Sequence, residues 1–177
     1  KTIAAATSAD SRSAKYPASV WPSVAVDSSG NIVVAFQDNR TDPDPLWTGQ
    51  TGTGDSTDVD NWQIVTRRRL VGAATWGELV SIGENIRAER HPSVAVSQTG
   101  QWVVAFDSKT LDAAGANLSV QAAISTDNGA NFGSILNISN NPNAMSQYPR
   151  LTQIRSGLIR AVWYDNRSSD YRWRIAH

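Results

Sequence analysis

The chain of 177 residues is long enough for one full domain, contains no cysteine, and balances 16 basic against 16 acidic residues. These values exclude disulfides, thiol catalysis and cysteine-ligated metal, and they give no long-range attraction to nucleic acid or to an anionic membrane. No apolar run approaches the roughly 18 residues of a transmembrane helix, so no membrane span is expected. Short Val, Ile and Ala runs are separated by Ser, Thr, Asn, Asp and Gly, which favours an all-β fold. The compartment is left open, with a secreted or extracytoplasmic bacterial location favoured.

Three segments of the chain, 21–36, 91–106 and 148–163, align with one another without a gap. A repeat with offsets of this size is typical of propellers or arrays. Each segment reads as two strands joined by a short turn that carries a glycine. The matching positions hold a proline (Pro22, Pro92, Pro149), a glycine (Gly30, Gly100, Gly157) and an aromatic residue (Phe36, Phe106, Trp163).

A second pair of strands follows in the middle repeat, over about 118–126 and 133–139. The first repeat carries the same second half, because Asn61 and Trp76 stand where Asn117 and Phe132 do, both at a spacing of 56. The repeating unit is therefore predicted to be a four-stranded antiparallel meander, which is the blade of a β-propeller.

Three blades are expected, at about 19–84, 90–140 and 147–177, and the third lacks its fourth strand. The β-like run Lys1–Thr7 is predicted to complete it. Three blades fall below the usual four to eight, so the ring is expected to be completed to six blades by missing sequence or by a second chain. The second alternative is a homodimer formed by exchange of terminal strands.

The turn Ser125–Phe132 reads S-x-D-x-G-x-x-F, and each fixed residue has a physical reason. Ser125 and Asp127 can accept hydrogen bonds from nearby backbone amides, Gly129 supplies a left-handed conformation, and Phe132 anchors the loop on the strands. In the first repeat the matching positions hold Arg, Val and Ala, so that copy of the turn is degenerate.

This turn resembles the Asp box of sialidases and related BNR-repeat proteins, and the P-S-V-A-V strand pairs resemble the first two strands of their blades. The resemblance implies a sialidase-like β-propeller in which the Asp box is structural and lies on the face away from the substrate. The opposite face holds the links between blades and the loops that join strands two and three.

On that opposite face the sequence places residues near strand-one starts, among them Trp21 and Arg150, and three polar segments after strand two. These are Asp38-Asn39-Arg40, Asp107-Ser108-Lys109 and Asp165-Asn166-Arg167. In a structural interpretation each Asp caps its loop, and each Arg pairs with that Asp or with the next blade. A functional interpretation uses the arginines to hold a carboxylate or sugar hydroxyls. The candidate ligand-binding residues are Asp38, Arg40, Arg90, His91, Tyr148, Asp165 and Arg167.

The resemblance implies, for a catalytic sialidase, three arginines on the substrate carboxylate, a Tyr–Glu pair, an Asp acid/base and an F/Y-R-I-P signature. The nearest stretch here, Tyr148-Pro149-Arg150-Leu151, has the wrong order, so no catalytic residue is transferred. The leading hypothesis is a non-catalytic module that binds carbohydrate or protein. The alternatives are an exo-sialidase-like glycoside hydrolase, assembled from two chains or truncated, and a purely structural repeat.

The insert 41–61 is rich in Thr, Gly and Asp. Hard cations such as Ca²⁺ favour oxygen-rich loops, although the spacing matches no defined calcium loop. Asp55, Asp58 and Asp60 are therefore weak candidates for a calcium site, and no other cofactor is expected.

Overall fold

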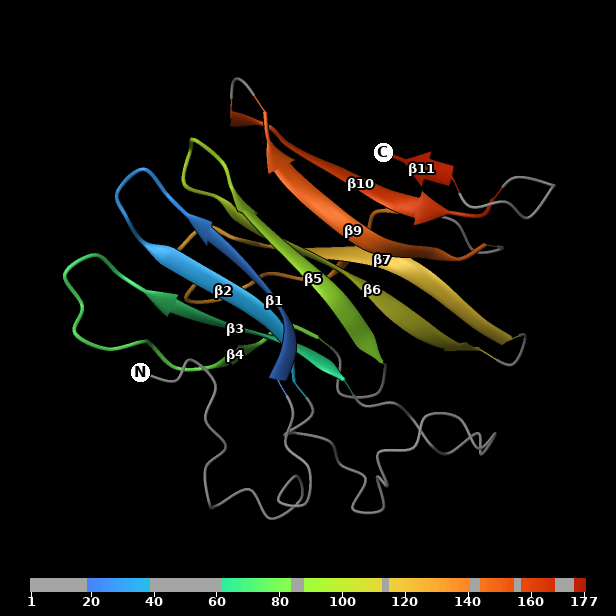
Figure 1. Cartoon of the computed structure of the whole chain (residues 1–177), viewed down its shortest axis with the longest axis horizontal. Helices are drawn as coiled ribbons and strands as arrows, with labels where there is room; N and C mark the ends of the chain where they lie inside the picture. Colours follow the sequence, from blue (N-terminus) through green and yellow to red (C-terminus); the bar gives the residue numbers. More distant parts are fainter. Residues whose placement is uncertain are drawn as a thin grey trace, which may run out of the picture.

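The computed structural model describes residues 19–38, 62–83, 88–112, 115–140, 144–154, 157–167 and 174–177, with the backbone alone for residues 109–112 and 115–117. These residues form three antiparallel sheets, called sheets A, B and C (Figure 1). Sheet A contains β1 (Ser19–Val26), β2 (Ile32–Asp38), β3 (Gln63–Arg69) and β4 (Val80–Ser81). Sheet B contains β5 (Glu89–Val96), β6 (Trp102–Asp112), β7 (Gly115–Ser125) and β8 (Leu136–Asn137). Sheet C contains β9 (Ser146–Gln153), β10 (Ile159–Asp165) and β11 (Arg174–Ala176).

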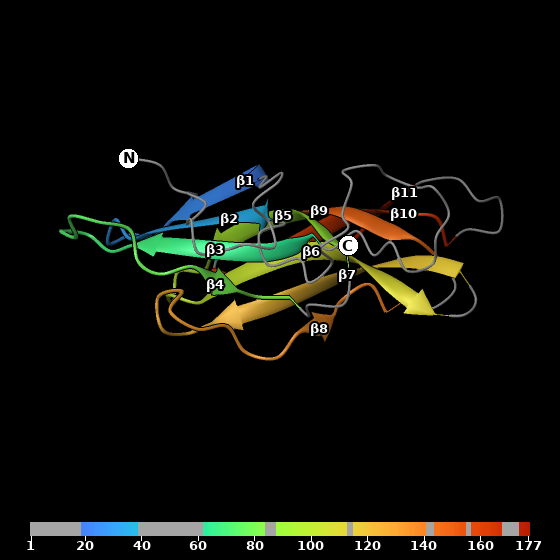
Figure 2. The ribbon, with the colours of Figure 1, turned by 90° about the horizontal axis from the view of Figure 1, so that it is seen from below.

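Each sheet is a meander, because strands that are consecutive in the sequence are neighbours in the sheet. The fold class is confirmed to this extent: the described chain is all-β, with three antiparallel sheets of three to four strands that are compatible with blades of part of a propeller. The first strands of the sheets, β1, β5 and β9, lie in one row (Figure 1), and in the view of Figure 2 β1 and β8 lie at opposite edges of the layered assembly. The predicted N-terminal strand 1–7 lies outside the described residues.

The fourth strand of sheet B is shorter than the sequence predicts, at Leu136–Asn137 instead of 133–139. Its ladder with β7 consists of two residue pairs. On one side Gly133 N is used by the turn, where it donates to Ile124 O at 2.9 Å. On the other side the amides of Ile138 and Ser139 both donate to Val120 O, which ends the regular register.

The turn between the first two strands of each sheet has the glycine that the repeat predicts. Gly30, Gly100 and Gly157 have φ angles of +89°, +81° and +78°, a region that favours glycine. In sheet A the carboxylate of Asp27 accepts hydrogen bonds from the amides of Ser29 and Asn31 at 2.9 and 2.8 Å. Burial favours a higher pKa for Asp27, but the hydrogen bonds from Asn31 Nδ2, at 2.8 Å, and from the backbone amides outweigh it and lower the pKa below its ordinary value.

A bulge interrupts the first strand of each sheet just before its proline, with register shifts after Val20 in β1 and after Arg90 in β5, and a matching one in the β9–β10 ladder. The bulged residues Trp21, His91 and Tyr148 have φ angles of +55°, +52° and +56°. A following proline disfavours the right-handed helical region for each of them. The bulges therefore recur at one aligned position and orient three ring side chains in the same way.

Serine hydroxyls join the inner strands of neighbouring sheets. Ser23 Oγ in sheet A accepts a hydrogen bond from Val94 N in sheet B at 3.1 Å. Ser93 Oγ, at the aligned position in sheet B, accepts one from Leu151 N in sheet C at 2.9 Å. The same joint is therefore used twice along the chain.

Side chains near the ends of the second strands make a further joint at a second aligned position. Gln37 Oε1 accepts a hydrogen bond from the bulged amide of His91 at 2.9 Å, and Asp107 Oδ2 accepts one from the bulged amide of Tyr148 at 3.2 Å. Each bulge is therefore hydrogen-bonded to the preceding sheet. This bond satisfies the backbone N–H of the bulged residue, which has no partner in the strand ladder.

The main hydrophobic core lies between sheets A and B. The alternation of side chains in β2 and β6 directs one apolar set of each strand into the same layer. Its largest fully buried aromatic residues are Trp102 and Phe106, which pack with Val33 and Ile64. A second cluster lies on the other side of sheet A, where Phe36 packs with Trp76 and their neighbours. Trp76 therefore keeps the role of an aromatic anchor in the degenerate copy of the turn.

The turn Ser125–Phe132, called here the Asp-box turn for the motif that it resembles, connects sheet B to sheet A. Ser125 Oγ donates to Asp127 Oδ1 at 2.7 Å and accepts from Gly129 N at 2.9 Å, while Asp127 Oδ1 accepts from Asn131 N at 2.9 Å. These hydrogen bonds to Asn131 and Ser125 hold the pKa of the Asp127 carboxyl well below its usual range. Across the joint, Arg68 Nη1 of sheet A donates to Asp127 O at 3.1 Å. These hydrogen bonds connect the turn within sheet B to the third strand of sheet A.

Apolar side chains on the outer face of sheet A are exposed to solvent, whereas their counterparts in sheet B are buried. Val24 and Val26 are 62% and 55% exposed, whereas Val94 and Val96 at the aligned positions are 6% and 7% exposed. Sheet A covers these valines of sheet B. Among the described residues, no sheet covers the corresponding valines of sheet A.

Candidate functional site

Four aromatic side chains form a continuous row across the three sheets, and they are called here the aromatic row: Trp21, His91, Tyr148 and Tyr164. The ring centroids of Trp21 and His91 lie 4.8 Å apart in an edge-to-face arrangement. Those of His91 and Tyr148 lie 4.1 Å apart and tilted, and those of Tyr148 and Tyr164 lie 6.2 Å apart, again edge to face. The two edge-to-face pairs have the separation and geometry that aromatic rings favour, and the rings of His91 and Tyr148 lie closer together still.

The row has its position because of the three bulges. The first three rings stand on the bulged residues of β1, β5 and β9, which bring them to one level near the starts of these strands. Tyr164 comes from β10, where it pairs with Gln147 next to Tyr148. Half of the Trp21 side chain is exposed, and Tyr164 is similarly exposed at the other end of the row. The row therefore offers a ring surface to a ligand at both ends.

A carboxylate fixes the middle of the row. His91 Nδ1 lies 2.9 and 3.0 Å from the two carboxylate oxygens of Asp107, which is itself buried. Because a carboxylate accepts hydrogen bonds, Nδ1 carries the proton and donates it. Asp107 also accepts from Tyr148 N, so one side chain holds two neighbouring rings of the row.

A polar pocket of about 200 Å³ lies beside the row, lined by Trp21, Pro22, Ser23, Pro92, Ser93 and Arg150. The two serine oxygens accept backbone amides of the next sheet, so their own hydroxyl protons point away from those joints. Arg150 donates from Nη1 to Pro149 O at 2.9 Å. Within the described part of the chain, no carboxylate lies at ion-pair distance from the Arg150 guanidinium. The pocket thus combines two hydroxyls with a cation whose charge no described acid neutralises.

The end of β10 carries a compact ion pair. Arg167 donates to the buried carboxylate of Asp165 from Nε and Nη2, at 2.8 and 2.7 Å, and also from its backbone amide at 2.9 Å. Ser146 Oγ and Trp163 Nε1 donate to the same carboxylate. The bidentate guanidinium holds the pKa of the Asp165 carboxyl well below its usual range against the opposing effect of burial, and Asp165 in turn raises the pKa of Arg167.

The predicted ligand-binding residues fall into separate places. His91 and Tyr148 meet in the aromatic row, and Arg90 lies beside them opposite Asp107 in the β5–β6 ladder. Asp38 is buried and accepts a hydrogen bond from Ser19 Oγ at 2.6 Å. Asp165 and Arg167 pair with each other at the end of β10, and Arg40 lies outside the described residues.

The segment Asp107-Ser108-Lys109 is offset by one residue from the two Asp-Asn-Arg segments. In the ladders, Ser108 pairs with Glu89 as Asp38 pairs with Ser19, so Ser108 is the counterpart of Asp38. Asp107 matches Gln37 instead and points to the opposite face of its sheet. The sequence repeat already shows this offset. Asp107 directly follows the aligned aromatic residue Phe106, whereas Asp38 stands two residues after Phe36.

The candidate calcium residues Asp55, Asp58 and Asp60 lie outside the described residues. Where the structure does describe the chain, it contains no group of three His, Cys, Asp or Glu side chains that could hold a metal ion. Over the same residues there is no helix long and apolar enough to cross a membrane.

No family model matches the sequence, and no match is found among curated proteins. Among solved structures, a protein of unknown function from Dyadobacter fermentans DSM 18053 is similar to this chain with a TM-score of 0.56 and 16% identity, over 90% of this chain and 54% of that one. The Hadza microbial sialidase Hz136 is similar with a TM-score of 0.52 and 15% identity, over 89% of this chain and 33% of the sialidase. The endo-arabinase from Bacteroides thetaiotaomicron VPI-5482 is similar with a TM-score of 0.51 and 12% identity, over 89% of this chain and 54% of the arabinase.

These likenesses concern the fold alone, because all three identities are low. They support a sialidase-like arrangement of the sheets in coarse terms, as the resemblance of the Asp-box turn implies. The chain spans about half the length of two of these structures and a third of the other.

Proposed function

We propose that this chain is part of a β-propeller that binds carbohydrate, without cleaving it, along the aromatic row. The observation that carries the proposal is the row itself, which crosses three sheets and ends in exposed rings of Trp21 and Tyr164. The C–H groups on the face of a sugar ring pack against the electron-rich face of an aromatic side chain. A chain of such rings suits an oligosaccharide, which presents several sugar faces in succession.

The polar groups beside the row supply orientation. Ligand sites are mostly apolar with a few placed polar groups, and here these are the hydroxyls of Ser23 and Ser93 and the guanidinium of Arg150. A guanidinium in such a pocket favours a ligand that carries a carboxylate at one end. The names of two structural neighbours, a sialidase and an endo-arabinase, agree with a role in carbohydrate chemistry.

The test is a glycan array with neutral and acidic oligosaccharides, followed by calorimetric titration of the glycans that bind. Trp21→Ala is expected to weaken binding at least about tenfold, because it removes an aromatic contact surface. Arg150→Ala is expected to weaken acidic ligands more than neutral ones. Thr126→Ala is the matched control, since Thr126 is an exposed residue of the Asp-box turn, and it is expected to change neither.

Two outcomes would contradict the proposal. One is the absence of binding to every glycan at high protein concentration, which favours a purely structural repeat. The other is release of a fluorescent leaving group from a sialoside or arabinoside by the wild-type chain, which favours the hydrolase. Loss of that release in Trp21→Ala together with unchanged release in Thr126→Ala would place the hydrolase activity at the row.

A further inference from the structure

The Asp-box turn contains the only Asn–Gly pair of the sequence, Asn128–Gly129. In such a pair the backbone nitrogen of the glycine can attack the side-chain amide of the asparagine, because glycine has no Cβ atom that would shield its nitrogen. Asn128 is exposed, and its side-chain amide makes no hydrogen bond with the described part of the chain. The carbon that would be attacked is therefore accessible, and the reaction depends on the glycine nitrogen.

The structure restrains this nitrogen in two ways. Gly129 N donates a hydrogen bond to Ser125 Oγ at 2.9 Å. Gly129 is also buried and packs on Val33 of β2: a Cβ atom added to Gly129 would lie 2.8 Å from Val33 Cγ2. An amide nitrogen must lose its proton and move before it can attack, so the pair is unreactive while the turn lies on sheet A.

Sheet A holds the turn in this position. Arg68 Nη1 of β3 donates to Asp127 O at 3.1 Å and to Asn128 O at 3.4 Å. Phe132, at the end of the turn, packs against the core shared by sheets A and B. The Asn–Gly pair is therefore part of the joint between the two sheets, and its protection depends on an arginine 59 positions away from Asp127 in the sequence.

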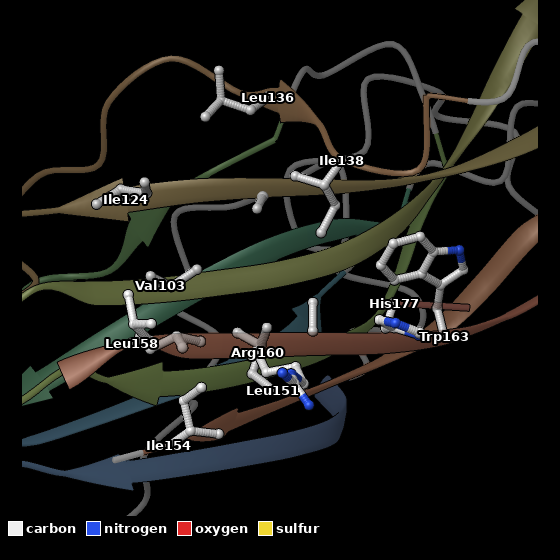
Figure 3. A pocket seen from close by; sticks show the side chains of 13 residues that line it. Val103, Ile124, Leu136, Ile138, Leu151, Ile154, Leu158, Arg160, Trp163 and His177 are labelled. Carbon is white, nitrogen blue, oxygen red and sulfur yellow. The ribbon is translucent and has the colours of Figure 1, made fainter. Parts of the chain in front are cut away.

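The next joint along the chain indicates how much apolar surface the turn covers. Val103 of β6 is the counterpart of Val33 in the aligned repeats, and it lines an apolar groove of about 510 Å³ between sheets B and C (Figure 3). Ile124, Leu136 and Leu158 on the walls of this groove are exposed. Val33, in contrast, is completely buried. Separation of the turn from sheet A would expose apolar surface over Val33, so we expect the separated state to be rare.

We propose that Asn128 is a deamidation site that is controlled by the joint between sheets A and B. When the turn separates from sheet A, Gly129 N is released and loses its proton to hydroxide. The nitrogen then attacks Cγ of Asn128, the bond between Cγ and the side-chain nitrogen breaks, and ammonia leaves with a proton from water. Water opens the resulting succinimide ring at either carbonyl, so Asn128 becomes aspartate or isoaspartate. The net reaction consumes one water and releases one ammonia, with no oxidation or reduction.

The isoaspartate product prevents the turn from returning to its place. Its main chain passes through the side-chain carbons, which adds one atom to the backbone before Gly129. The hydrogen bond from Gly129 N to Ser125 Oγ and the contact with Val33 both depend on the original backbone length, because protein interiors are close-packed. The modification is therefore a permanent record that the joint has opened.

The experiment follows deamidation of the folded chain in mildly alkaline buffer by peptide mapping with mass spectrometry. The same chain in urea gives the rate of the unrestrained pair. The folded chain is expected to react at Asn128 at least about tenfold more slowly, since only the opened fraction reacts. Arg68→Ala is expected to accelerate the folded-state reaction several-fold, because it removes both hydrogen bonds from sheet A to the turn. Arg69→Ala is the matched control and should leave the rate unchanged, because Arg69 Nε donates to Ala73 O within sheet A.

A second pair of variants acts within the turn itself. Ser125→Ala removes the acceptor of Gly129 N and is expected to accelerate deamidation, whereas Thr126→Ala, at an exposed position, should not. Hydrogen exchange of the Gly129 amide measures opening of the turn independently. It should rank the wild type, Arg68→Ala and Ser125→Ala in the same order as their deamidation rates.

The product gives a further measurement. The isoaspartate form, separated by chromatography from the unreacted chain and from the aspartate form, is expected to melt several degrees below the unreacted chain. It is also expected to bind more of a dye that fluoresces on exposed apolar surface. Asn128→Asp introduces the negative charge without the extra backbone atom, so it should melt close to the wild type.

The proposal is overturned if Asn128 reacts equally fast in the folded chain and in urea, or if it reacts in neither. It is also overturned if Arg68→Ala leaves the folded-state rate unchanged while urea increases it, because the protection then belongs to the turn alone. An isoaspartate form that melts together with the unreacted chain would refute the permanent opening of the joint.

Discussion

The contact between the Asp-box turn and sheet A gives a sharp prediction for Gly129→Ala. Two effects act on this substitution. Gly129 has a φ of +73°, a conformation that an L-residue adopts at a cost of about 1–2 kcal/mol. The new Cβ would also lie 2.8 Å from Cγ2 of Val33, which is completely buried and cannot move away into solvent.

Gly100→Ala separates the two effects. Gly100 has a φ of +81°, but a Cβ atom placed on it meets nothing within 4 Å. Gly100→Ala therefore has the same conformational cost as Gly129→Ala and the same loss of freedom in the unfolded state, but it creates no close contact. Overpacking of a core typically costs about 1–3 kcal/mol, so Gly129→Ala should destabilise the chain by about that much more than Gly100→Ala.

Urea unfolding followed by tryptophan fluorescence measures the difference, since Trp102 is fully buried and reports on the joint between the sheets. For a chain of this size, 1 kcal/mol corresponds to about 2–4 °C in the melting temperature. Val33→Ala is expected to be less harmful in the Gly129→Ala background than in the wild type, because it removes the clashing methyl groups. Equal effects of Gly129→Ala and Gly100→Ala would refute the close contact between the turn and β2.

Two further predictions concern other buried contacts. Gly83→Ala should destabilise the chain by more than about 3 kcal/mol in urea unfolding, because its Cβ would overlap the fully buried carboxylate of Glu89, which accepts a hydrogen bond from Ile64 N. Gly77→Ala is the control and should cost much less, because its Cβ would lie 3.4 Å from the nearest atoms. Asp165→Asn should lower the melting temperature at pH 7 and flatten its acid dependence. Because the folded-state pKa of Asp165 lies below the unfolded value of about 3.9, its contribution is present above that pH and is lost as the pH falls through the folded-state pKa. Melts from pH 7 down to pH 2.5 check this, and a difference between the two proteins that persists unchanged at the lowest pH would contradict it.

The fold was predictable because the repeat and the turn chemistry are local. Proline, glycine and aromatic residues at matched offsets indicate two strands and a turn, and the structure has Gly30, Gly100 and Gly157 in the conformation that such a turn requires. The spacing of 56 residues between the second halves of the first two repeats also relates a hydrogen bond in sheet A to one in sheet B. Gly77 N donates to Arg68 O just as Gly133 N donates to Ile124 O, although the first of these turns has lost its Asp box.

The site was less predictable because it depends on register. Ser19 faces Asp38 and Ser146 faces Asp165, but in sheet B the partners are exchanged, with Glu89 facing Ser108. A search for repeated acids after the second strands therefore selects Asp107, which faces the other way and serves the aromatic row. Tyr164 was missed for the same reason, since it occupies the position of Gln37 and Asp107 without sharing their chemistry.

The two open ends of the described assembly do not match each other chemically. Inside the chain, a sheet offers its successor a serine hydroxyl, from Ser23 or Ser93, and an amide or carboxylate oxygen, from Gln37 or Asp107. Sheet C holds Arg150 and Tyr164 at these two positions.

If sheet C of a second copy packed on the exposed Val24 face of sheet A, the amide of Val24 would meet the guanidinium of Arg150, which cannot accept a hydrogen bond, and the amide of Trp21 would meet the phenol of Tyr164. A buried amide without an acceptor costs about 1–3 kcal/mol. The joint chemistry therefore favours a separate sheet with a hydroxyl and an amide or carboxylate at these positions, over a second copy of this chain, as the element that covers sheet A.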